Sequence, residues 1–248
     1  MDSLTLVPRD DIDTDVSSIG PATTNSNEVR VLERSIYRGP NIFSLRPMVR
    51  VRIDIGSLET SPSNTLPGFS DRMLDLLPGL RAHHCSKGHA GGFVERLETG
   101  TWFGHIAEHV ALELQSLAGA AVTRGKTRSV RGRPGTYDLL VEYRDEQAAL
   151  LSVRHALTFL VELLPGRTTT VRDDKILPTT RLGTDASVDD RVAEIASLVR
   201  AGALGPSTQA IVDAARRRGI PVSRLDEQSL LQLGYGRRQR RVRASITV

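Results

Sequence analysis

The chain has very little cysteine, few aromatic side chains and no long hydrophobic run. Its single cysteine, Cys85, excludes an intramolecular disulfide and indicates a reducing, cytoplasmic location. No apolar run approaches the roughly 20 residues that a membrane-spanning helix needs. The acidic N-terminus also lacks the apolar stretch of a secretory signal. The sequence therefore favours neither a membrane protein nor a disulfide-stabilised secreted protein.

Aromatic residues make up only 4% of the 248 residues, so platforms on which nucleic-acid bases stack are scarce. The net charge of +4 is unevenly distributed along the chain. Residues 1–30 hold six acidic and two basic side chains, whereas residues 191–248 hold eleven basic and four acidic ones. A basic C-terminal part attracts acidic polymers or phosphates. Nucleic acid is not an expected partner, because the aromatic content is so low.

The hydrophobic content of 39% is sufficient for a real core. Alternating apolar and polar residues predict strands over 48–55 and 136–143. Helical periodicity predicts a short helix within 61–80 and longer helices over 102–118 and 145–164. Together these elements predict an α+β fold, in which helices cover one sheet.

Four parts are expected along the chain. Residues 1–30 are acidic and aperiodic, which predicts a disordered leader. A two-layer N-terminal domain is expected over 31–166, followed by a linker rich in Thr, Asp and Pro over 167–190. A small α/β unit is expected over 191–248.

The small unit has its own pattern of helices and strands. Helices are predicted over 189–201 and 207–219, and a short strand over 220–225. A last helix is predicted just before Gly234.

Within the helix expected over 102–118, the stretch GHIAEHVALELQ carries two histidines four residues apart. On a helical wheel, His105, Glu108, His109 and Glu113 fall on one side, and a stripe of valine, leucine and alanine falls on the other. We expect the apolar side to pack on the sheet. The polar side is either a solvated face or a functional one.

Two observations favour a functional face. No lysine or arginine occurs between Arg96 and Arg124, although arginine is common elsewhere in the chain. Histidines at positions i and i+4 can converge on one metal ion, and zinc accepts such a pair. H-x-x-E-H is also the pattern of the inverzincin metallopeptidases. In that pattern His105 and His109 are zinc ligands, and Glu108 is the catalytic general base that activates water.

A third metal ligand must come from elsewhere in the fold. Glu146, at the start of the helix expected over 145–164, is the first choice, and Glu142 and Glu113 are the alternatives. Glu113 has a second interpretation, in which it orients an imidazole through the nitrogen that does not bind metal.

The glycine-rich stretch HHCSKGHAGGF at 83–93 precedes this helix. We expect His84 and Cys85 to pack this loop and to line a cleft beside the helix. A separate Cys/His zinc site in the loop is the alternative, but such sites usually contain paired cysteines.

Five separated phrases occur in the chain: YRGPNIFSLRPMVRVRIDI (37–55), PSNTLPGF (62–69), HCSKGHAGGFVERLETGTWFGHIAEHVALELQSLAG (84–119), LGPSTQAIVDAARRRGIPVSRL (204–225) and LLQLGYGRRQRRVRASIT (230–247). Together they resemble the N-terminal part of the cyanophycin synthetase family. Members of that family polymerise aspartate and arginine, without a ribosome, into a poly-aspartate backbone that carries arginine on its side chains.

The resemblance implies a partner and a cofactor. Ahead of two ATP-dependent ligase modules, family members have an N-terminal domain that binds the polymer, cyanophycin. In some members this domain is similar to a metallopeptidase and trims the polymer into primers. Its histidine–glutamate zinc site then lies in the region that matches His105, Glu108 and His109. The resemblance therefore implies cyanophycin as the partner, Zn²⁺ as the cofactor and, because the full enzymes are multimeric, a homo-oligomer.

Residues 191–248 resemble the start of the family's ATP-grasp module. No P-loop or other phosphate-cradling pattern occurs in the chain, so ATP and Mg²⁺ are expected only in the full-length family context. Three functions follow as hypotheses: a zinc-dependent hydrolase that makes primers, a non-catalytic polymer-binding module, and a truncated part of the ligase.

Overall fold

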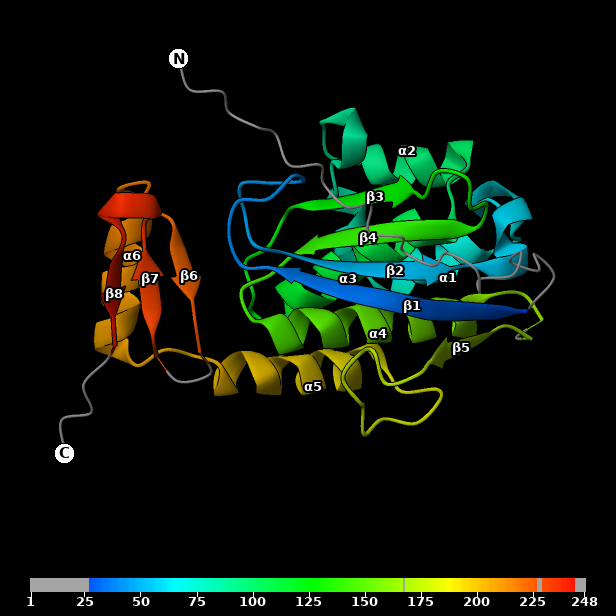
Figure 1. Cartoon of the computed structure of the whole chain (residues 1–248). Helices are drawn as coiled ribbons and strands as arrows, with labels where there is room; N and C mark the ends of the chain where they lie inside the picture. The colour runs from blue at the N-terminus through cyan, green and yellow to red at the C-terminus, as the bar shows by residue number, and fades with distance from the viewer. Residues whose placement is uncertain (1–26, 167, 227–228, 244–248) are drawn as a thin grey trace, which may run out of the picture.

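The computed structural model describes residues 27–166, 168–226 and 229–243 (Figure 1). Most of the leader predicted over 1–30 therefore lies outside the described residues. Its last residues, from Glu28 on, belong to the first strand. No helix in the described ranges is long and apolar enough to cross a membrane.

The larger unit is built on a five-stranded sheet in the order β3-β4-β2-β1-β5. Neighbouring strands pair antiparallel, except that β5 pairs parallel with β1. The mixed sheet with its helices confirms the predicted α+β class. The strands are β1 (Glu28–Tyr37), β2 (Met48–Asp54), β3 (Gly125–Ser129), β4 (Thr136–Glu142) and β5 (Thr170–Asp173).

Helices α3 and α4 cover one face of this sheet, and α5 packs on the side of α4 that is away from the sheet (Figure 1). The inward residues of β2 are valine and isoleucine, and its arginines point to the opposite face, as a half-buried strand requires. The helices are α1 (Phe69–Leu76), α2 (Gly92–Thr99), α3 (Phe103–Leu117), α4 (Glu146–Leu163) and α5 (Val188–Ala201). Short 3₁₀ turns span Gly56–Thr60, Ser63–Thr65, Pro78–Ala82 and Cys85–Lys87.

Helix α3 is the centre of the unit. Twelve of its 15 residues are buried, which excludes the solvated polar face that the wheel allowed. Strands β3 and β4 lie on one side of α3, α4 lies on a second side, and the segment from Pro78 to Thr99 covers a third. Its polar residues are therefore enclosed by protein and need partners there.

The segment 167–190 differs from the predicted linker, because it contains β5. This strand adds four residues to the edge of the sheet beside β1. Asp173 at its end is held by the guanidinium of Arg154 on α4. The segment is thus a structural part of the larger unit. Its strand is only four residues long, and the polar composition of the segment gives no sign of it.

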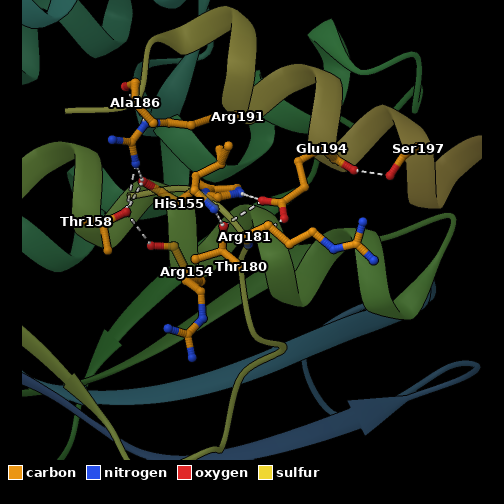
Figure 2. A network of polar contacts seen from close by, with 10 residues as sticks. Arg154, His155, Thr158, Thr180, Arg181, Ala186, Arg191, Glu194 and Ser197 are labelled. Carbon is orange, nitrogen blue, oxygen red and sulfur yellow. Dashed lines mark hydrogen bonds and ion pairs between the residues drawn. The ribbon is translucent and has the colours of Figure 1, made fainter. Parts of the chain in front are cut away.

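A network of polar contacts fastens α5 to α4 (Figure 2). Arg191 on α5 is 2% exposed and donates to Thr158 Oγ1 at 2.8 Å and to Glu162 Oε2 at 2.6 Å, both on α4. His155 of α4 contacts Glu194 of α5 through Nε2 and Oε2, 2.8 Å apart. Arg191 and His155 are buried and their glutamate partners are partly exposed, so these contacts satisfy the buried polar groups and join the two helices.

The smaller unit consists of α6 (Pro206–Arg217) and a three-stranded antiparallel sheet in the order β6-β7-β8. The helix predicted before Gly234 is wrong: β7 occupies that place. Its leucines alternate with a glutamine and pair with a strand on either side. The other elements are β6 (Val222–Arg224), β7 (Leu231–Leu233), β8 (Arg240–Val242) and a 3₁₀ turn at Gly236–Arg238.

Candidate metal centre

Three potential metal ligands meet beside the N-terminal half of α3. The side chains of Cys85, His105 and His109 each offer a ligand atom, and these atoms lie within 4.8 Å of one another. His105 Nε2 is 3.2 Å from Cys85 Sγ, and its Nδ1 is 2.8 Å from Thr101 Oγ1. We refer to Cys85, His105 and His109 as the Cys/His cluster. It is the one such group of three found among the described residues.

The glycine-rich loop brings Cys85 to the helix. Cys85 itself has a φ of 55°, a left-handed conformation that few non-glycine residues adopt. At Gly92 a Cβ atom would lie 2.2 Å from the carbonyl oxygen of His84, so only glycine allows the loop to close there. The side chain of His84 is exposed and has no place in the Cys/His cluster. Of the two residues expected to line the cleft, the structure brings only Cys85 to α3.

Phe93, at the start of α2, fixes the two imidazoles. Its ring stacks on that of His109, with centroids 4.1 Å apart, and meets the ring of His105 edge-on at 5.9 Å. His109 is only 6% exposed, whereas His105 and Cys85 are half-buried. The cluster is therefore rigid on the α2 side and reachable by solvent near His105 and Cys85.

His83 joins the cluster although sequence reasoning had placed its neighbour His84 there. His83 Nδ1 lies 2.9 Å from His109 Nδ1, and His83 Nε2 lies 3.0 Å from Glu113 Oε2. A Cβ at Gly79 would lie 1.9 Å from Glu113 Oε1, so this carboxylate sits against bare backbone. Glu113 thus contacts the imidazole of His83, and not that of His105 or His109, the histidines expected to bind metal.

Burial decides the charge of the cluster. Desolvation lowers the pKa of His105 to about 4, with a further contribution from the charge of Arg96. Desolvation also lowers the pKa of His109 to about 2, and His105 and His83 add to that effect. Both rings are neutral near pH 7, which is the form that binds metal. Two neutral imidazoles and a cysteine sulfur would suit a zinc ion, and three protein ligands would leave room for a substrate or water.

Glu108, the expected general base, points in another direction. Its side chain is 4% exposed and faces β3, where Thr127 Oγ1 donates to its Oε2 at 2.8 Å. A Cβ at Gly125 would lie 2.1 Å from its Oε1. Burial raises the pKa of Glu108 to about 8, although the bond from Thr127 opposes this shift. At neutral pH the group is mainly a protonated acid packed against the sheet.

The expected third ligand, Glu146, also lies outside the Cys/His cluster. Arg38 Nε donates to it at 2.6 Å, and the Tyr143 hydroxyl donates to it at 3.3 Å. The alternative, Glu142, accepts from Arg46 at 2.8 Å.

The way β4 runs along α3 explains why Glu142 and Glu146 lie far from His105. Strand β4 runs along this helix, so that Tyr137 is packed against Gly104, and Gln115 Nε2 donates to the carbonyl oxygen of Glu142 at 3.2 Å. The end of β4 is therefore about ten helical residues, or roughly 15 Å, from His105.

Comparison with known proteins identifies the domain that carries this site. Residues 50–165 match the family model described as the cyanophycin synthase-like N-terminal domain. The cyanophycin synthetases of Trichormus variabilis and Nostoc sp. are each 39% identical over 221 residues, which is 88% of this chain and 23% of each relative. That of Synechocystis sp. is 38% identical and is covered over 24% of its length. The chain spans about a quarter of the length of these curated relatives. Residues 50–165 thus form a cyanophycin synthase-like N-terminal domain, and most of the chain is similar to about a quarter of the length of cyanophycin synthetases.

Proposed function

We propose that this domain binds cyanophycin, the polymer in the name of its relatives, and hydrolyses it with a zinc ion held by the Cys/His cluster. The observation that carries the proposal is the convergence of Cys85, His105 and His109 within 4.8 Å on a half-buried surface. Since the Cys85 sulfur takes the place of a carboxylate, the ligand set differs from the two histidines and a glutamate of the H-x-x-E-H pattern.

The side chains around the cluster divide the chemistry between them. A zinc ion bound there would supply a Lewis acid for a peptide carbonyl and for water. Cys85, His105 and His109 hold the ion, and Phe93 keeps the rings in place. His83 positions the ring of His109, because its Nδ1 lies 2.9 Å from His109 Nδ1 and Glu113 holds its Nε2. Glu108 supports the helix from the sheet side.

Metal content tests the first half of the proposal. Purified protein is expected to hold about one zinc ion per chain by mass spectrometry of the metals. His105→Ala and Cys85→Ser are expected to lose most of it, and His84→Ala, a matched change at an exposed neighbouring histidine, is expected to retain it. A wild-type protein that takes up no zinc, even when zinc is supplied, contradicts the proposal.

Polymer length tests the second half. Wild-type protein incubated with cyanophycin is expected to shorten the chains, as followed by gel electrophoresis. A chelator and His105→Ala should both stop this reaction, and His84→Ala should not. His83→Gln should lower kcat while most zinc is retained, because it removes the contact that orients His109 and leaves the three ligands in place.

A non-catalytic polymer-binding module is the second candidate. The position of Glu108 favours it, because the carboxylate expected as the general base faces Thr127 on β3 and not the Cys/His cluster. In this case His105→Ala binds cyanophycin as well as the wild type does, and neither protein shortens it. The ligase activity of the full-length family, with ATP and Mg²⁺, stays a separate prediction that the downstream sequence of the gene would decide.

A further inference from the structure

Strand β3 is an edge of the five-stranded sheet, and half of its backbone groups face outward. Glu142 N donates to Arg124 O at 2.8 Å, and Val130 N donates to Thr136 O at 2.9 Å. In an antiparallel pair the residues that bond to the partner alternate with those that do not. The backbone groups of Gly125, Thr127 and Ser129 therefore point away from β4, and in the described part of the chain no backbone group pairs with them on that side.

Five basic side chains lie on this edge and on the turn that joins β3 to β4. No acidic residue occurs between Glu113 and Asp138. All five side chains are exposed, and no carboxylate in the described ranges forms an ion pair with any of them. We call them the edge cations: Arg124, Lys126, Arg128, Arg131 and Arg133.

The adjacent arginines of β2 show how this sheet treats a cation that has only a structural role. Arg52 is bound at both ends by Asp138 and Glu33, and Arg50 is bound by Glu33 and Ser35. Arg128 lies instead over the ring of Phe43, 5.4 Å from its centroid. The edge cations thus have charge available for a ligand, while the inner arginines do not.

The spacing of the edge cations fits an extended chain. Thr127 points to α3, so Arg124, Lys126 and Arg128 project together from the opposite face of β3. Side chains on one face of a strand are spaced about 6.8 Å apart, and a peptide strand added beside β3 has the same spacing. Its alternate side chains would each meet one cation, and its backbone would pair with Gly125, Thr127 and Ser129.

We propose that the free edge of β3 binds an extended, carboxylate-bearing peptide chain by strand addition, with the edge cations pairing its carboxylates. The inference rests on the binding half of the proposed function and deepens it by naming the strand that holds the chain, and its test requires neither metal nor hydrolysis. A peptide is favoured over a nucleic acid because the edge offers alternating N–H and C=O groups with which a peptide backbone can pair. Bases would need several aromatic rings to stack on, and the ring that contacts an edge cation is that of Phe43, under Arg128. Charged residues also protect sheet edges from pairing, and that role predicts no binding at all.

The test uses the whole chain and a fluorescent poly-L-aspartate peptide, followed by anisotropy at low and at physiological salt. The wild type should bind saturably, and more weakly as salt rises. Lys126→Glu with Arg128→Glu should weaken binding about tenfold or more, because two attractions become repulsions. The matched pair Arg237→Glu with Arg238→Glu, at exposed arginines of the smaller unit, should stay within about twofold, as expected for charges outside the contact.

Ser129→Pro separates strand addition from simple charge attraction. Proline removes an outward N–H and is tolerated at such an edge position. It should weaken peptide binding several-fold while the salt dependence is retained. Absence of saturable binding overturns the proposal, as does a Lys126/Arg128 variant within twofold of the wild type or a Ser129→Pro variant that binds normally. A single-stranded oligothymidylate that displaces the peptide at equal charge would identify a nucleic-acid surface instead.

Discussion

Replacing Glu108 by glutamine should make the protein more stable at alkaline pH. The carboxyl is 4% exposed, and burial raises its pKa from 4.5 to about 8. Between these values the folded protein keeps a proton that the unfolded chain has released. The contribution of the Glu108 carboxyl to stability is therefore complete below pH 4.5 and is lost as the pH rises through 8. A gap of about 3.5 pH units at about 1.4 kcal/mol each gives a loss of about 5 kcal/mol.

Glutamine has the shape of the protonated acid and stays neutral at every pH. Its amide can donate to Thr127 Oγ1, so the contact with β3 survives. The variant should match the wild type at pH 5 and exceed it at pH 9 by most of this free energy. Urea unfolding followed by circular dichroism at pH 5, 7 and 9 measures the difference. Glu98→Gln, at an exposed glutamate of α2, is the control and should change little at any pH.

A constant difference between Glu108→Gln and wild type across the pH range would refute this reasoning, because it would mean that Glu108 ionises normally in the folded protein. The same variant also bears on catalysis. If polymer hydrolysis survives in Glu108→Gln, Glu108 is a structural acid; if hydrolysis is abolished while alkaline stability rises, Glu108 is the base despite its burial.

Three further outcomes are expected. Gly92→Ala should cost about 1–3 kcal/mol in urea unfolding, because its Cβ would strike a backbone oxygen 2.2 Å away, whereas Gly183→Ala, with open space around its Cβ, should cost little. Arg191→Met should destabilise by about 3–5 kcal/mol, since it removes a buried guanidinium that bonds both Thr158 and Glu162. Glu162→Gln should cost less in this variant than in the wild type, and full additivity of the two changes would contradict the coupling. Burial lowers the pKa of His155, although Glu194 opposes the shift. The free energy of unfolding should therefore fall as the pH drops below about 6.5, because the unfolded chain takes up a proton there that folded His155 does not. His155→Gln should reduce this pH dependence in the same urea assay.

The sequence predicted the elements with long, clear periodicity. Helices α3 and α4 and strands β2 and β4 lie within a residue or two of their expected bounds. Strand β3, with glycine, lysine and arginine at three of its five positions, has no apolar alternation, because it lies at an edge with little to bury. The four residues of β5 are too few to stand out from a polar segment.

The candidate site was only partly accessible to pattern reasoning. The wheel placed His105, His109 and Glu113 on one face of α3, and they lie against the same covering segment. Glu108 directly precedes His109, and the rotation of about 100° between neighbouring helical residues turns its side chain toward β3. Helical periodicity cannot tell which of His83 and His84 faces inward, since the loop conformation around Cys85 and its glycines decides it.

The order of the sheet determines how much chain makes a self-sufficient unit. A fragment cut to the matched range 50–165 would lack β1, the neighbour of β2, and would turn an inner strand into an open edge. It would also lack β5 and the α5 helix that Arg191 fastens to α4. The smallest piece that retains every strand of the sheet and this fastening runs from about residue 27 to 201, well beyond both ends of the sequence match.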